Sequence, residues 1–388
     1  MEPSTGHQVD YDIHGIVGVR LLNATAGDIT AVTNQLGRPH GPLNRDPDIV
    51  ISFKEELSTP SMKYLGLNSA GFTDDGFYVL SSSRANAKAR IPFEKIGGQC
   101  ELLCESGLRS VPWLFAIINL TFLSKGYVPL HASAFVYNGV GILVTGWTKG
   151  GKTEALLSFA NHGAYYVGDE WVILSSDGEK MFGMSVPICL WEWQFEHIPS
   201  LLPKIGIEKK ALFKSIHFLE FVQRTFGQGR LKNHFPFTIL TEALPAFRQQ
   251  LNIRVSPENI FGNRLRNVAT IDKLFLAMSH SESSISVEPC NPMEIAQRMT
   301  SSNEYEQMPF LEYYKAFKFA FPGLENELLE RIDALQHSLL CRALEGKDAY
   351  KVLHPYPVSL EALFNRMKPF CQKKPENSMQ KSADAIRA

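Results

Sequence analysis

The chain has 388 residues, of which 44% are hydrophobic and 20% are charged, and its formal net charge at pH 7 is −1. This length and hydrophobic content allow a large core and fit about two or three domains. Because the net charge is close to zero, composition gives no reason to expect nucleic acid or an anionic membrane as a partner. The six cysteines show no paired C-x-x-C spacing, which argues against a disulfide scaffold and a zinc site.

The start of the chain and its apolar segments bear on location. Residues 1–15 lack the basic stretch and the apolar stretch of a secretory signal. No later segment reaches the roughly 18 uncharged apolar residues that a membrane span needs. We therefore expect a cytoplasmic protein with no membrane partner.

Residues 1–108 form the first predicted region, which is rich in β-strands. Short runs of β-branched and aromatic residues at 16–21, 48–53 and 76–81 are separated by turn residues, as strands are. No catalytic constellation occurs in this region. We expect a small β domain or an extension of a neighbouring sheet.

The second predicted region, 109–300, begins with an apolar segment at 111–125. This segment is long enough for a buried helix and too short to span a bilayer. His131 follows it. A lone histidine after an apolar run is usually a core residue, and the pattern alone leaves open whether His131 belongs to the core or to a site.

The strongest functional signal lies between Gly146 and Thr153. The sequence GWTKGGKT matches G-x-x-x-x-G-K-[ST], with a strand-like run before it and a helical pattern after it. In this context the glycines let successive backbone N–H groups point at phosphate oxygens, at the positive end of the helix dipole. We expect Lys152 to neutralise the β- and γ-phosphates and the Thr153 hydroxyl to bind Mg²⁺. The residues predicted to contact the nucleotide are Gly146, Thr148, Lys149, Gly150, Gly151, Lys152 and Thr153.

Two carboxylates, Asp169 and Glu170, end the next predicted strand at 164–167. A metal that bridges phosphates needs oxygen ligands, and phosphoryl transfer to a hydroxyl needs a base for its proton. Neighbouring residues of an extended segment point to opposite faces, so we expect only one carboxylate to face the phosphates. We favour Asp169, as base or metal ligand, with Glu170 supporting it.

The loop, the short helix after it and the acidic pair resemble the kinase domain of HPr kinase/phosphorylase and its relatives. That family shares its fold with phosphoenolpyruvate carboxykinase. The family's histidine ahead of the loop is matched by His131, in the sequence LHASA, and its Phe-Gly turn by residues 261–262. The arginine after that turn is matched best by Arg266, with Arg264 as the alternative. The resemblance implies an α/β fold of the HPr kinase-like, phosphoenolpyruvate carboxykinase-like P-loop type.

The resemblance also implies an activity. It predicts a kinase that uses ATP and Mg²⁺ and transfers the γ-phosphate to a hydroxyl of a small molecule, a peptide or a protein. Its catalytic residues are expected to be His131, Asp169, Glu170 and Arg266. The chain has no clear equivalent of the Glu-Arg-Gly-Leu-Gly stretch of the bifunctional enzymes, so we expect neither a phosphorylase reaction nor HPr as the acceptor. The alternatives are a hydrolase of nucleoside triphosphates and a nucleotide-binding regulatory scaffold.

A basic segment at 204–232 lies within a predicted insertion at 195–255. The pattern alone suits either a solvated helix face or an anionic acceptor, and we expect its positive side chains to compensate the negative charge of the acceptor. No nucleic-acid-binding module is recognisable in it, so we expect no nucleic-acid partner. Its basic residues are Lys204, Lys209, Lys210, Lys214, Arg224, Arg230 and Lys232.

The last predicted regions are a helical one at 301–371 and a polar, disordered tail at 372–388. An amphipathic pattern at 324–344 suits either packing on the core or a seam between two copies of the chain, and a homo-oligomer is therefore left open. Strands are expected at 271–278 and 284–288, before a helix that starts at 292.

Overall fold

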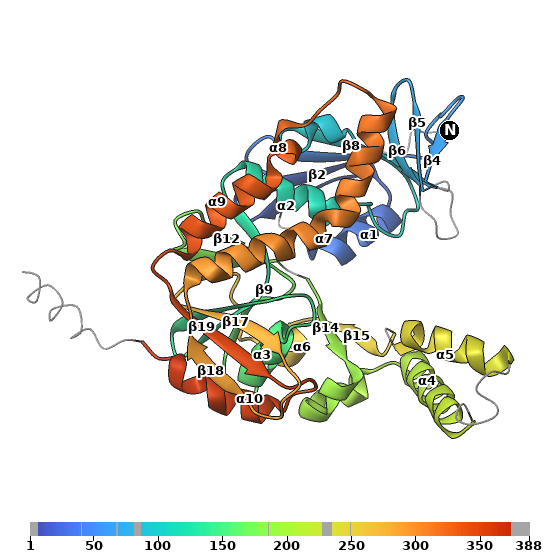
Figure 1. The fold of residues 1–388 in the computed structure, drawn as a ribbon. Helices are drawn as coiled ribbons and strands as arrows, with labels where there is room; N and C mark the ends of the chain where they lie inside the picture. The colour runs from blue at the N-terminus through green and yellow to red at the C-terminus, as the bar shows by residue number, and fades with distance from the viewer. Residues whose placement is uncertain are drawn as a thin grey trace, which may run out of the picture. The chain divides into compact units, whose positions relative to one another are not determined.

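The computed structural model describes residues 7–39, 41–66, 69–80, 87–184, 186–226, 235–248 and 250–373 (Figure 1). It is a mixed α/β protein with two large mixed β-sheets and helices, which confirms the predicted class at this coarse level. Packing divides the chain into two units. Met1–Val186 and Arg266–Ala388 form the first, and Pro187–Leu265 forms the second. The region boundaries predicted at residues 108, 300 and 371 remain predictions.

The first sheet of the first unit has eight strands in the order β1-β2-β3-β8-β7-β6-β5-β4. Its central strands β2, β3 and β8 are parallel neighbours. The strands predicted at 16–21, 48–53 and 76–81 correspond to β2, β3 and β6. The strand bounds are His7–Ile13 (β1), Val17–Ala24 (β2), Ile49–Lys54 (β3), Lys63–Leu65 (β4), Ala70–Thr73 (β5), Gly76–Leu80 (β6), Lys88–Arg90 (β7) and Cys100–Glu105 (β8).

Two helices and a short turn accompany this sheet. Helix α1, Ala26–Leu36, was not predicted, although Thr25 and Asp28 form a capping box at its start. Helix α2, Leu114–Ser124, lies within the apolar segment predicted to be a buried helix. Most of its side chains are buried, as expected for a helix that is hydrophobic all round. A 3₁₀ turn, η1, covers Phe93–Lys95.

The second sheet has nine strands in the order β16-β13-β12-β9-β10-β17-β19-β18, with β11 paired to β9. Strands β10, β17 and β19 are parallel, so their carboxyl ends meet at one edge. All ten residues of β9 are buried. The bounds are Val128–Tyr137 (β9), Val140–Thr145 (β10), Tyr165–Gly168 (β11), Trp171–Leu174 (β12), Lys180–Gly183 (β13), Val268–Thr270 (β16), Lys273–Ser279 (β17), Ser286–Pro289 (β18) and Asp348–His354 (β19).

The helices of the first unit that follow in the chain include α3, Lys152–Ala160, and α7, Pro292–Ala320. The amphipathic pattern at 324–344 forms two helices, α8 (Glu327–Glu330) and α9 (Ile332–Leu344), because Arg331 leaves the helical conformation. Leu339, Leu340 and Leu344 of α9 are buried in the core of the chain itself. The last elements are α10, Leu360–Met367, and η4, Lys368–Phe370.

The second unit holds the predicted insertion. Its strands β14, Ile188–Trp191, and β15, Asn252–Val255, pair antiparallel. Its helical elements are Glu192–His197 (η2), Pro199–Lys204 (η3), Ile207–Phe226 (α4), Phe235–Arg248 (α5) and Glu258–Phe261 (α6).

Some predicted features lie outside the described residues. These are Arg230 and Lys232 of the basic segment, residues 374–388 of the tail, and the side chain of Lys204. Among the helices that the structure describes, none has the length and apolar character of a membrane span.

Candidate functional site

The Gly146–Thr153 loop connects the carboxyl end of β10 to the start of α3, as predicted. Gly146 has a φ of 153° and lies against β17, where an added Cβ would come within 2.3 Å of the Ala277 carbonyl oxygen. Only glycine fits this approach. Gly151 is the N-cap of α3 and offers no side chain to the first N–H groups of the helix. Those groups therefore suit an anion such as phosphate.

Lys152 turns back onto its own loop. Its Nζ donates hydrogen bonds to the carbonyl oxygens of Gly146, at 3.2 Å, and Trp147, at 2.9 Å. The side chain is buried, and this burial lowers the pKa of the ammonium group. The loop thus holds a desolvated cation beside the start of α3, the charge expected of a residue that binds phosphate.

Lys149 and Thr148 are the remaining predicted contacts in the loop. Lys149 is exposed, with a left-handed φ of 59°, and Thr148 is half-buried. Both precede α3, which begins at Lys152.

Asp169 lies against the start of α3 and is 1% exposed. The Thr153 hydroxyl donates to it, with Oγ1 3.1 Å from Oδ2 and 3.3 Å from Oδ1, and the Ser133 hydroxyl of β9 also donates to Oδ1. Burial, together with the charge of neighbouring Glu170, raises the pKa of Asp169 to about 7. The structure therefore joins the two residues predicted to hold Mg²⁺.

Glu170 marks the point where the chain passes from β11 to β12. Its φ of 67° turns the backbone, and its side chain is 43% exposed. The two carboxylates therefore differ in exposure, and that only Asp169 faces the phosphates remains a prediction. This difference in exposure arises from the left-handed turn at Glu170 as well as from the alternation of side chains along an extended strand.

His131 lies between two carboxylates. Its Nε2 is 3.2 Å from Oε2 of Glu170, and its Nδ1 is 3.0 Å from Oε1 of Glu306 on α7. Burial by itself lowers the pKa of His131, but these two hydrogen bonds outweigh it and raise the pKa overall. Both ring nitrogens face acceptors, so the geometry favours the imidazolium form. His131 therefore belongs with the acidic pair and is not an isolated core residue.

His354, at the carboxyl end of β19, contacts the Gly146–Thr153 loop and was not predicted as a site residue. It is fully buried, with Nε2 3.0 Å from the Gly150 carbonyl oxygen and Nδ1 2.8 Å from that of Pro355. A Cβ on Gly151 would come within 2.0 Å of its Nε2. The only sequence signal was a histidine at the end of a strand, and that strand was itself not predicted.

Arg266 lies beside the start of β11, and its role at the acidic pair remains a prediction. Its guanidinium carbon lies 4.6 Å from the centre of the Tyr165 ring, and its backbone N–H donates to Tyr166 at 2.8 Å. Tyr165 begins β11, and Asp169 follows the end of that strand, roughly 13 Å away at the usual rise per residue. Arg264, the alternative, lies 5.9 Å from the ring centre of Phe261.

The oxygen donors suit a metal that arrives with a nucleotide. Among the described residues, no group of three or more His, Cys, Asp and Glu side chains forms a metal site on its own. Thr153 Oγ1 and Asp169 Oδ2 are adjacent hard oxygens. Mg²⁺ typically takes one or two protein oxygens and completes its shell with phosphate oxygens and water. These two residues therefore fit Mg²⁺ bound together with a phosphate chain.

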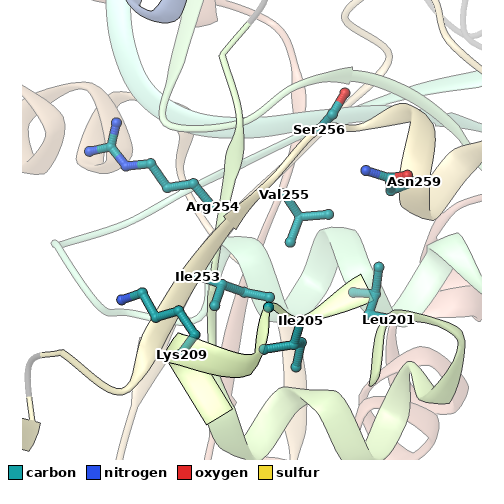
Figure 2. Close-up of a pocket in the computed structure, with 9 residues that line it drawn as sticks. Leu201, Ile205, Lys209, Ile253, Arg254, Val255, Ser256 and Asn259 are labelled. Carbon is teal, nitrogen blue, oxygen red and sulfur yellow. The ribbon is translucent and has the colours of Figure 1, made fainter. Parts of the chain in front are cut away.

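A cavity of about 300 Å³ lies in the second unit (Figure 2). Its walls are part apolar and part polar, and Figure 2 shows Lys209 and Arg254 toward one side of it. Lys209, a member of the predicted basic segment, donates to the Asn252 carbonyl oxygen at 3.2 Å. No residue predicted to bind nucleotide lines this cavity. Its lining residues are Leu201, Ile205, Gly206, Lys209, Ile253, Arg254, Val255, Ser256 and Asn259.

Comparison of the sequence with models of known protein families gives no match, and comparison with curated proteins gives none either. The function is therefore argued from the site.

Proposed function

We propose that the chain is an ATP-dependent kinase of the HPr kinase-like, P-loop type that transfers the γ-phosphate to a hydroxyl group. One observation carries this proposal: Thr153, at the start of α3, donates to a buried Asp169 whose pKa is raised to about 7. A regulatory scaffold can share the loop but needs no carboxylate prepared to take a proton at neutral pH, whereas a hydrolase would use the same carboxylate on water and is separated from a kinase by the fate of the phosphate.

The chain's residues divide the work. Lys152 and the first N–H groups of α3 hold the phosphate chain of ATP. Asp169 accepts the proton of the attacking hydroxyl, since a base works best when its pKa is close to the working pH. The His131 imidazolium, held by Glu170 and Glu306, supplies positive charge close to the acidic pair. Mg²⁺, held by Thr153, would neutralise the phosphate oxygens, and Asp169 would serve either as its second ligand or as the base.

The acceptor is proposed to be a small hydroxylated molecule or a peptide rather than HPr, because the Glu-Arg-Gly-Leu-Gly stretch of the bifunctional enzymes has no equivalent here. The alternatives differ from this proposal in turnover. A hydrolase releases inorganic phosphate without labelling an acceptor, and a scaffold releases none.

The test combines binding and transfer. Titration calorimetry with Mg·ATP should show binding to the wild type and a loss of about 100-fold or more in affinity for Lys152→Ala, because the variant lacks a buried charge on the phosphates. Lys180→Ala removes an exposed lysine of β13 and should bind normally. ATP labelled in its γ-phosphate, incubated with the protein and a cell extract, should label an acceptor. Equal affinity in wild type and Lys152→Ala would show that the loop assignment is wrong.

A further inference from the structure

Two aromatic side chains stand exposed together beside the Gly146–Thr153 loop. Trp147 lies in the loop and Tyr305 on α7, and their ring centres are 4.9 Å apart at an angle of 37°. Each residue is 47% exposed. Large aromatic side chains usually bury most of their surface, and an exposed pair offers ring faces and edges to a ligand.

The pair lies at the acceptor end of the proposed site. Lys152, which is expected to hold the β- and γ-phosphates, donates to the carbonyl oxygen of Trp147 itself. Tyr305 precedes Glu306, the residue that holds His131 next to Glu170. The aromatic pair is therefore carried by the same loop and the same helix as Lys152 and Glu306, the residues beside which an acceptor hydroxyl is expected to arrive.

The charges at this end favour a cation. The carboxylates of Glu170 and Glu306 keep 43% and 25% of their side-chain surface exposed. His131 offsets one of these charges, and Lys152 is committed to phosphate. Lys149, an exposed residue of the same loop, is one of the predicted nucleotide contacts. Aromatic faces next to carboxylates are how proteins commonly bind ammonium groups.

We propose that the acceptor is a hydroxyl compound that also carries an ammonium group, bound by Trp147 and Tyr305 and by the carboxylates of Glu306 and Glu170. This inference rests on the proposed kinase function for the acceptor's role, but the cation site itself can be tested apart from it. The proposed site, made of residues of the first unit alone, gives the acceptor a positive charge. The basic segment of the second unit would instead suit an anionic acceptor.

Choline and 3,3-dimethylbutan-1-ol provide a matched pair of probes, because they share shape and hydroxyl group and differ only in charge. We expect calorimetry on the full chain, with and without a non-hydrolysable Mg·ATP analogue, to show choline binding at least about ten-fold more tightly than the neutral alcohol. Tyr305→Leu and Glu306→Gln should each reduce this preference. Tyr64→Leu, which removes a 61% exposed tyrosine from β4, should leave it unchanged.

The outcomes separate the two proposals. Equal binding of the two probes, binding of neither, or an unchanged preference in Tyr305→Leu would overturn the cation site. Selective choline binding by a protein that does not bind Mg·ATP would retain the cation site and overturn the kinase.

Discussion

Two buried aspartates, one beside each large sheet, have opposite surroundings. Asp10 of β1 accepts two hydrogen bonds from Arg20, at 2.8 and 3.0 Å, and one from the Leu43 backbone at 2.9 Å. These bonds, above all those from Arg20, lower the pKa of Asp10. The hydrogen bonds that Asp169 accepts from Ser133 and Thr153 come from neutral hydroxyls, and burial raises its pKa to about 7.

The difference separates a carboxylate that stabilises the fold from one suited to chemistry. Asp10 has its counter-charge within the chain, so its ionised form favours folding. Asp169 is buried next to another carboxylate, Glu170, and its ionised form opposes folding until a cation arrives. A protein keeps such a group where a ligand supplies the missing charge.

The largest expected effect is on Asp169. Asp169→Asn should lower turnover by about 10³-fold, because the amide cannot accept the proton, while nucleotide binding persists. The same variant should gain stability relative to wild type as pH rises. The folded pKa of about 7 lies above the unfolded value of 3.8, so the stability contributed by the protonated carboxyl is full below pH 3.8 and lost as pH rises through 7. Urea unfolding at pH 5 and pH 8 measures this, and a stability difference between variant and wild type that is the same at both pH values would contradict it.

Asp10→Asn should behave in the opposite way. We expect it to unfold more easily at pH 7 by about 2 kcal/mol, since the partly exposed Arg20 loses a charged hydrogen-bond partner. The folded pKa lies below the unfolded one, so the effect should be present above the unfolded value and fade as pH falls through the folded pKa. Turnover per folded molecule should not change. A loss that persists undiminished in acid would show that the ion pair is not its cause.

Gly151→Ala should weaken Mg·ATP binding by about ten-fold, because the new Cβ strains a left-handed φ of 103° and collides with His354. Gly139→Ala is the matched control. Its φ of 74° is also left-handed, but no atom lies within 4 Å of the added Cβ. Both variants should lose some stability in thermal unfolding, and only the first should lose nucleotide. Equal Mg·ATP affinities in the two variants would contradict the role assigned to the contact between Gly151 and His354.

The smallest effect is expected for His131→Asn. The raised pKa of His131 means that its contribution to stability is full below the ordinary value of 6.5 and is lost as pH rises through the folded pKa. We expect a destabilisation of about 1 kcal/mol at pH 6 that shrinks at pH 9, measured by urea unfolding. A constant difference across this range would mean that charge plays no part.

The sequence predicted those parts of the site that depend on neighbouring residues. The loop, α3 and the acidic pair follow one another closely, and each has a local pattern of glycines, spacing or charge. Glu306 and His354 had no such signal, because they reach the site only through the packing of α7 and β19. The resemblance suggested Arg266, but the pairing of its backbone with Tyr166 holds it near the start of β11.

The same distinction explains the fold. Strands with continuous β-branched runs, such as β3 and β10, were found from their composition. Strand β19 was not, because its sequence DAYKVLH mixes charged and apolar residues, and its place beside β17 depends on a partner far away in the chain. Helix α1 was overlooked because it interrupts a region that otherwise consists mainly of strands.

The contact between His354 and Gly150 has a consequence for how the protein is made. The two residues are separated by 204 positions, so the loop lacks its buried support until β19 has left the ribosome. A nascent chain that contains the loop but not β19 lacks the His354 ring nitrogen that contacts the Gly150 carbonyl oxygen. Nucleotide binding by the Gly146–Thr153 loop would therefore begin late in synthesis, once β19 has packed against it.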